Sequence, residues 1–309
     1  MLKLRDYQLD VKRQVYQHIR EGQNKILLCA GTGSGKCLGK GTPILMYDGS
    51  IKQVESIVIG DRLMGDDSSP RTVLSLSKGQ EELFKITPVK GDSWVCNASH
   101  ILSLQSTADK GRFKNNQIYD IPINEYIGFG VTHKHVLKQY RTGVTQFGNQ
   151  TDDLPVDPWL LGLFIGDGHK GLGSFHLNDT TKIDVAAKAS LVLSQAGFKS
   201  NSSRECSNHG IRLSPVIDTA TEKFIDYVRK AWNGERLFTH TLYIPHQYKT
   251  SSVENRLAIL AGLIDSDGSY DGRSISFTTV SDRLADDFCF VARSLGLAAY
   301  KTFRTTQCN

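Results

Sequence analysis

A nine-residue motif occurs twice in this chain, and the two copies lie 100 residues apart. They span residues 160–168 and 260–268, and each has glycine at its third position and Asp-Gly at its end. Shorter matches follow at nearly the same offset, namely 174–177 with 274–277 and 193–198 with 292–297. The repetition predicts two similar α+β halves, packed about a pseudo-twofold axis, within residues 154–309.

Each copy of the motif has the pattern of a helix with one face of small residues. Gly162 and Gly166 are four residues apart, as are Gly262 and Ser266, so each pair lies on one helix face. Small residues on a shared face allow two helices to approach at backbone distance. We therefore expect the two motif helices to pair and to end together at their terminal glycines.

The residues that precede these glycines, Asp167 and Asp267, are the candidate catalytic and metal-binding residues. Paired helices would bring the two carboxylates to one place, where they repel each other unless a cation lies between them. Mg²⁺ suits such a place because it takes oxygen ligands, keeps several waters and accepts phosphate as a further ligand. It can also activate water for phosphodiester hydrolysis. The alternative is two ordinary packed helices that each end in Asp-Gly.

The double motif resembles that of the LAGLIDADG (DOD-type) homing endonucleases, and the second copy differs from the namesake string only at Ser266. The resemblance implies saddle-shaped β-sheets that grip a long, asymmetric double-stranded DNA target. It also implies that the two aspartates act as metal-binding catalytic acids. Inteins of this family often carry Lys-x-Ile-Pro before the second motif, but Leu242 stands at the lysine position here. Lys249 or His240 could serve instead as an auxiliary base.

A different signal lies near the N-terminus, where the short apolar run 25–30 leads directly into a glycine-rich turn and a lysine. This is the P-loop arrangement, in which backbone N–H groups and the lysine surround phosphates. The segment 5–8 before it resembles the adenine-contacting element of superfamily II helicases. The candidate ATP-binding residues of this α/β piece are Gln8, Gly31, Thr32, Gly33, Ser34, Gly35 and Lys36. The alternative is an unrelated glycine-rich turn.

The P-loop pattern demands Ser or Thr after the lysine, to bind Mg²⁺, but Cys37 occupies that position. From there the chain consists of short apolar runs broken by turns, such as the hairpin signal Asp48-Gly49. This pattern predicts an all-β domain over residues 37–105. The start at Cys37, the stretch 60–65 and the block 97–100 resemble the Hint-type splicing domain of inteins. Asn97 stands where that block usually has Thr.

The resemblance implies an N-to-S acyl shift at the bond between Lys36 and Cys37. The cysteine thiol would attack the carbonyl of Lys36 and convert the peptide bond into a thioester. His100 would protonate the departing nitrogen, and Asn97 would hold the scissile peptide by hydrogen bonds. Excision would then restore Gly-Lys-Thr/Ser in the host. The alternatives are a small buried cysteine and a histidine that only packs in the core.

Full splicing also requires a terminal His-Asn pair, whereas this chain ends in Gln307-Cys308-Asn309. We therefore expect a separate C-terminal intein and extein piece as a partner, and an incomplete second endonuclease half. The expected order of domains is a helicase-like extein fragment (1–36), the N-terminal part of the splicing domain (37–105), a basic connecting region (106–153) and the endonuclease (154–309). The connecting region could contact DNA or could be a solvated surface.

Composition restricts the other possibilities. The six cysteines contain no C-x-x-C pair, which argues against a zinc site or a disulfide framework. The chain has no apolar run of about 18 residues and no secretory signal, so we expect a cytoplasmic protein of a microbe or of a phage-infected cell. A net charge of +5 is compatible with DNA binding. Two competing hypotheses are an ATP-dependent helicase fragment and a catalytically inactive DNA-binding remnant.

Overall fold

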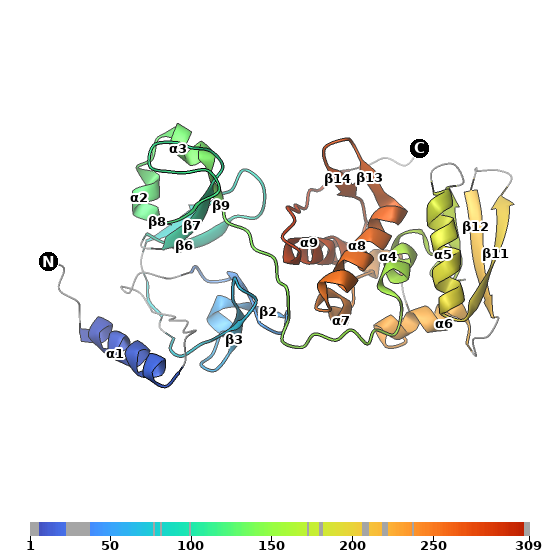
Figure 1. Ribbon diagram of the computed structural model, residues 1–309, viewed down its shortest axis with the longest axis horizontal. Helices are drawn as coiled ribbons and strands as arrows, with labels where there is room; N and C mark the ends of the chain where they lie inside the picture. Colours follow the sequence, from blue (N-terminus) through green and yellow to red (C-terminus); the bar gives the residue numbers. More distant parts are fainter. Residues whose placement is uncertain are drawn as a thin grey trace. The chain divides into compact units, whose positions relative to one another are not determined.

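The computed structural model describes residues 6–22, 38–76, 78–80, 82–98, 100–171, 173–178, 182–205, 210–217, 222–236 and 238–305. The chain divides into two compact units, Met1–Thr142 and Gly143–Asn309 (Figure 1). Both units mix helices with small antiparallel sheets. Across the described ranges, no helix combines the length and the apolar character that crossing a membrane requires.

Unit 1 contains helix α1 (Asp6–Arg20) and, after the segment that includes Cys37, a series of short strands. These strands form antiparallel pairs: β1 (Pro43–Leu45) with β2 (Ile51–Gln53), β3 (Arg62–Met64) with β4 (Pro70–Thr72), and β5 (Leu83–Ile86) with β6 (Trp94–Asn97). The 3-10 turn η1 (Val54–Ser56) follows β2. The predicted turn between β1 and β2 is confirmed, because Gly49 has φ 82° and Asp48 accepts a hydrogen bond from the Ser50 amide at 2.9 Å.

The second part of unit 1 is a three-stranded sheet with β7 (Ile101–Ser106) between β8 (Ile118–Pro122) and β9 (Leu137–Gln139). Two short helices, α2 (Ile123–Ile127) and α3 (Val131–Val136), lie between β8 and β9 in sequence (Figure 1). The core of this part joins residues before and after position 105: Cys96, Leu102, Leu104, Phe113, Ile121, Ile123, Val136 and Leu137. Residues 106–142 therefore fold with the strands that precede them.

Unit 2 shows the internal repeat in its order of elements. The first half contains α4 (Pro158–Asp167), β10 (Phe175–Asn178), α5 (Ile183–Gln195), β11 (Phe198–Glu205), β12 (Gly210–Ile217), α6 (Phe224–Arg229) and η2 (Lys230–Trp232). After η3 (Thr239–Thr241) and α7 (His246–Lys249), the second half contains α8 (Val253–Asp267), β13 (Gly268–Tyr270), β14 (Ile275–Phe277) and α9 (Asp282–Ser294). The helix–strand–helix series thus recurs, as the sequence predicts.

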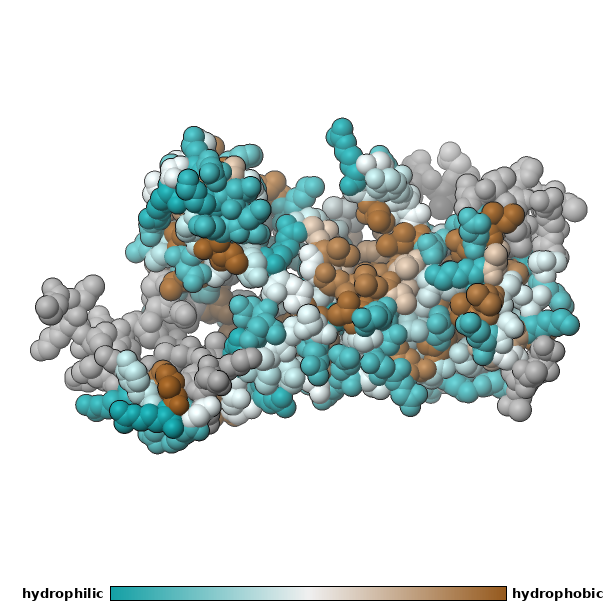
Figure 2. Space-filling view, viewed as in Figure 1, coloured by the Kyte–Doolittle hydropathy of each residue, from teal (hydrophilic) through white to brown (hydrophobic). Residues whose placement is uncertain are grey.

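The described strands of the two halves form sheets of different size. In the first half β12 lies between β10 and β11, whereas in the second half β13 pairs with β14 in a two-stranded sheet. Figure 2 shows apolar side chains exposed on the face of unit 2 around α8 and α9. Large apolar residues that are more than half exposed in this half are Tyr270, Ile275, Val280, Leu297 and Phe303.

The two motif helices, α4 and α8, pack against each other at backbone distance. A Cβ built on Gly162 would lie 2.9 Å from the Leu263 amide nitrogen, and one built on Gly262 would lie 2.8 Å from that of Leu163. Only glycine fits at these two positions without a shift of the backbone. The predicted pairing of the motif helices through their small residues is confirmed.

The replacement Gly262→Ala tests this contact. The new methyl group would overlap the carbonyl oxygen of Trp159, which belongs to the partner helix and cannot yield as a flexible side chain could. We expect the free energy of unfolding to fall by about 2 kcal/mol, because overpacking outweighs the better helix propensity of alanine. Urea unfolding of unit 2 measures the change.

The control for this prediction is Leu257→Ala, which alters an exposed side chain of the same helix α8. We expect it to change the unfolding free energy by less than about 0.5 kcal/mol. Equal stability of Gly262→Ala and the control would show that α4 and α8 do not approach at backbone distance.

Candidate functional site

The carboxylates of Asp167 and Asp267 lie at the paired C-terminal ends of α4 and α8. Each aspartate is the last residue of its helix. Asp267 reaches toward the partner helix, since a Cβ built on Gly166 would lie 3.1 Å from its Oδ2 atom. The two side chains are close enough for the charge of Asp267 to raise the pKa of Asp167. The structure therefore brings together the two acids that the sequence singles out.

Lys182 is the basic partner of this pair. Its Nζ donates a hydrogen bond to Asp167 Oδ2 at 2.7 Å and another to the carbonyl oxygen of Ser266. Burial raises the pKa of Asp167, the hydrogen bond and charge of Lys182 lower it, and Asp267 raises it again. Partial desolvation and like-charge repulsion at the site are thus opposed mainly by the Lys182 ammonium group, and the charge of Lys170 acts in the same direction.

A second lysine, Lys170, lies near the two aspartates at the C-terminal end of α4. Its Nζ donates to the carbonyl oxygens of Phe164, Ile165 and Gly168 at 2.6, 2.8 and 2.7 Å, which are groups at the C-terminal end of α4. Burial lowers its pKa to about 8, although the two aspartates act in the opposite direction. Because an ammonium group complements the negative end of a helix dipole, Lys170 serves as the C-terminal cap of α4.

The two auxiliary bases suggested from the sequence make other contacts. Lys249 Nζ lies 2.5 Å from Asp287 Oδ1, so its charge pairs with an acid of α9. His240 is exposed and stacks on Phe238, with ring centroids 6.0 Å apart. Leu242, which directly precedes Tyr243-Ile244-Pro245, is a core residue with 2% of its surface exposed. The basic group that does touch the acid pair is Lys182.

The donor set at the acid pair fits Mg²⁺. Within the described ranges, no three or more His, Cys, Asp or Glu side chains are grouped so that they could hold a metal ion together. Mg²⁺ does not need such a cage, because it is usually held by one or two carboxylates together with waters and substrate phosphate. Asp167 and Asp267 would supply those carboxylates.

The second candidate site lies in unit 1, where Cys37 and the P-loop residues 31–36 fall outside the described residues, as does the side chain of Gln8. Leu38, the next residue after Cys37, forms an antiparallel bridge with Cys96, and the Gly39 amide donates to the Val95 carbonyl at 2.7 Å. The chain that follows Cys37 therefore runs beside β6, the strand that ends in Asn97.

Asn97 and His100 belong to one tight turn. Asn97 is fully buried, and its carbonyl oxygen accepts a hydrogen bond from the His100 amide at 3.2 Å. The His100 carbonyl in turn accepts from the Ile123 amide at 3.0 Å, which ties the turn to the start of α2. The backbone N–H and C=O of His100 are thus both hydrogen-bonded.

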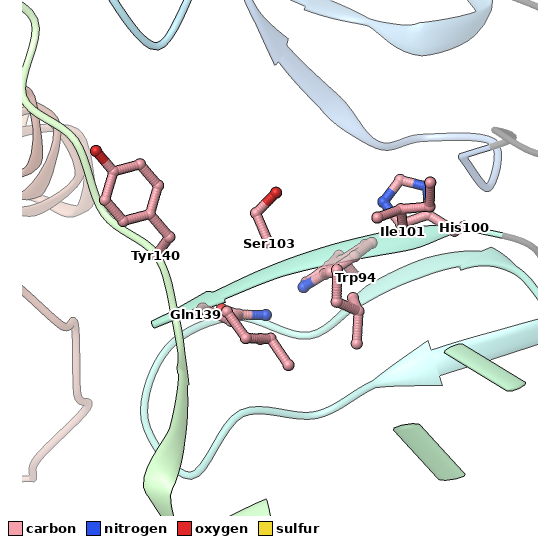
Figure 3. A pocket seen from close by; sticks show the side chains of 8 residues that line it. Trp94, His100, Ile101, Ser103, Gln139 and Tyr140 are labelled. Atoms are coloured by element: carbon pink, nitrogen blue, oxygen red, sulfur yellow. The ribbon is translucent and has the colours of Figure 1, made fainter. Parts of the chain in front are cut away.

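The imidazole of His100 lines a pocket of about 370 Å³ (Figure 3). Trp94 meets the His100 ring edge-to-face, with centroids 5.3 Å apart. Figure 3 shows His100 near one end of the pocket, Tyr140 at the other and Ser103 between them. The remaining lining residues are Ile101, Leu102, Leu104 and Gln139. His100 is thus held in an open, partly polar pocket where it can exchange protons with a bound group.

Two regions of the chain match known protein families. Residues 37–144 match the family described as Hom_end-associated Hint, and residues 243–308 match the family described as homing endonuclease. The chain carries a Hint domain and a homing endonuclease domain. Together these two domains indicate an enzyme of protein splicing and of DNA cleavage.

The two matches contain most of the candidate residues. The Hint match begins at Cys37, includes Asn97 and His100, and runs to residue 144, two residues beyond the end of unit 1. The homing endonuclease match includes Asp267, whereas Asp167 belongs to the first motif copy, which precedes that match in sequence.

A curated ATPase subunit shows partial similarity to the chain. Over 112 residues the chain is 32% identical to the catalytic subunit of the V-type proton ATPase from Candida tropicalis. This alignment covers 35% of the chain and 10% of that protein, so the chain spans about a tenth of its relative's length.

The sequence does not predict the two lysines of the endonuclease site. Lys170 lies three residues beyond Asp167, and a basic residue just past a helix end is a recognisable cap. Lys182 lies 15 residues beyond Asp167 with a strand between them, and no spacing rule connects the two positions. Its role follows only from the tertiary structure.

Proposed function

We propose that this chain is an intein that interrupts the P-loop of an ATPase and carries a LAGLIDADG homing endonuclease. The observation that supports the endonuclease best is the pairing of α4 and α8 through glycines, which places Asp167 and Asp267 together. A long, asymmetric double-stranded DNA site is the proposed substrate. The proposed cofactor is Mg²⁺, held by these two aspartates.

The residues around the acid pair have distinct roles in this proposal. Bound there, Mg²⁺ would activate water and stabilise the leaving oxygen of the scissile phosphodiester. Asp167 and Asp267 would hold the cation. The glycine contacts between the two helices keep these carboxylates close to each other. Lys170 keeps the end of α4 in place through its bonds to three backbone carbonyls. Lys182 supplies a positive charge beside Asp167.

For the splicing domain we propose an N-to-S acyl shift at Cys37. The Cys37 thiol loses its proton to solvent as its sulfur bonds to the carbonyl carbon of Lys36, and the C–N bond breaks. The freed nitrogen takes a proton from His100, and solvent returns a proton to His100. Asn97 would hold the scissile peptide. The bridge between Leu38 and Cys96 supports this arrangement, because it brings the residue bonded to Cys37 beside the strand that carries Asn97.

The host in this proposal is a P-loop ATPase whose ATP and Mg²⁺ site becomes intact only after excision. The similarity to part of a V-type proton ATPase supports an ATPase as the kind of protein that carries such an intein. The narrower proposal of a helicase host depends on the sequence of residues 5–8 and of the P-loop.

Cleavage of the uninterrupted host gene tests the endonuclease. One supercoiled plasmid would carry the host sequence with the intein codons removed, and a second would carry the interrupted gene. With the protein and Mg²⁺ we expect linear product from the first plasmid only, because the intein codons split the recognition site in the second. Agarose electrophoresis separates the two forms of DNA.

A catalytically inactive DNA-binding remnant is the second candidate, favoured by the buried Leu242 at the lysine position. It predicts a shift of the uninterrupted DNA in a native gel without any cut. Failure either to cut or to shift this DNA would contradict both candidates.

A further inference from the structure

Lys182 contacts both α4 and α8 near their paired C-terminal ends, which is where the proposed metal would bind. It lies immediately before α5, and its Nζ bonds to Asp167 Oδ2 of α4 and to the Ser266 carbonyl oxygen of α8. One ammonium group thus bridges a carboxylate and a backbone oxygen from different helices. Oxygens of these two kinds are also the ligands that a hard divalent cation takes.

We propose that Lys182 is a built-in counter-cation that occupies the cation position of the acid pair until a divalent metal displaces it. This inference rests on the proposed function, since it assumes that Asp167 and Asp267 bind the metal. It adds a property that the endonuclease chemistry does not require, namely that metal binding is an exchange of one cation for another.

The contrast with Lys170 supports this assignment. The Lys170 ammonium bonds to backbone carbonyls at the end of α4 and is a fixed cap. The Lys182 side chain keeps 22% of its surface exposed, and that of its partner Asp167 keeps 14%. Lys182 can therefore swing into water when a metal ion takes its place beside Asp167, whereas release of Lys170 would remove a donor from several backbone carbonyls.

Electrostatics gives the direction of the expected effect. Two nearby carboxylates in a partly desolvated site repel each other, and a cation beside them relieves the repulsion. With Lys182 present, a metal ion must replace an existing favourable interaction. Without Lys182 the pair loses the ammonium group that is bonded directly to Asp167 and keeps the nearby charge of Lys170, so the metal supplies more of the neutralisation. Removal of Lys182 should therefore tighten metal binding.

Direct Mn²⁺ titration by electron paramagnetic resonance tests the proposal without any DNA cleavage. Four proteins would be compared: wild type, Lys182→Met, the control Lys199→Met and the ligand variant Asp167→Asn. Lys199 is exposed on β11 and undergoes the same loss of charge. We expect Lys182→Met to bind Mn²⁺ at least about tenfold more tightly than wild type, and Lys199→Met to bind like wild type. Asp167→Asn should lose the site.

A thermal melt with and without Mn²⁺ accompanies the titration and confirms that each variant is folded. The stabilisation by saturating Mn²⁺ should be larger for Lys182→Met than for wild type, since a ligand that binds more tightly stabilises the folded state more. Binding to wild type that depends on Asp167, but is equal or weaker in Lys182→Met, would overturn the counter-cation alone. Absence of any Asp167-dependent Mn²⁺ binding in both proteins would overturn the proposed metal site as well.

Discussion

The replacements Asp167→Asn and Asp267→Asn are each expected to abolish DNA cleavage while DNA binding persists. The two carboxylates lie together at the paired C-terminal ends of α4 and α8. The loss of either therefore leaves only one carboxylate of the pair to hold a divalent cation. We expect the single-turnover rate to fall by about a hundredfold to a thousandfold, which is the scale on which one charge-stabilising group acts. Quantified cleavage of the uninterrupted plasmid gives this rate.

Folding is not expected to suffer in these variants. Asparagine has nearly the same volume as aspartate, and its neutrality removes the repulsion that raises the pKa of Asp167. Filter binding at one fixed salt concentration should give nearly unchanged DNA affinity, because phosphate contacts elsewhere dominate it. The control is Asp271→Asn, an exposed aspartate in the turn between β13 and β14, which should cut like wild type. A variant at Asp167 or Asp267 with the wild-type rate would remove that residue from the chemistry.

The second large effect is expected at the splicing site, where His100→Ala should slow thiol-dependent cleavage between Lys36 and Cys37. Breaking an amide C–N bond requires a proton on the departing nitrogen, and His100 faces an open pocket from a fixed turn. A positioned general acid contributes about 10² to 10⁴ in rate, so a loss in this range is expected. The rate of appearance of the shortened chain on a denaturing gel, in the presence of dithiothreitol, measures it.

His135→Ala is the matched control, because His135 is exposed on α3 in the same unit. It should cleave at the wild-type rate. Thermal melts of both variants would show whether unit 1 remains folded. An unchanged rate in a folded His100→Ala protein would assign the proton transfer to another group.

The endonuclease site could be predicted from sequence as far as its geometry depends on local spacing. Glycines four residues apart mark a contact face on any helix, and a second copy of the motif supplies the partner for that face. The position of the Asp167 and Asp267 carboxylates follows from these facts alone. Lys182 could not be found in this way, because a strand and a turn separate it from Asp167, and only the packed structure brings its ammonium back.

The splicing domain shows the same division between local and long-range information. The hairpin at Asp48-Gly49 is a local signal and forms as predicted. The bridge between Leu38 and Cys96 joins positions far apart in the chain, and no residue pattern specifies that register. The sequence also does not show that unit 1 continues beyond residue 105, because α2 and α3 are too short to give a helical periodicity.

The central claim, that this chain is an intein, is tested most directly by intact-mass spectrometry of the purified protein with and without dithiothreitol. We predict that the thiol releases a fragment whose mass matches residues 1–36, because it intercepts the thioester formed at Cys37. Cys37→Ala should keep its full mass under both conditions. Contradiction would come from an intact wild-type mass in the presence of the thiol, or from release of the same fragment by Cys37→Ala.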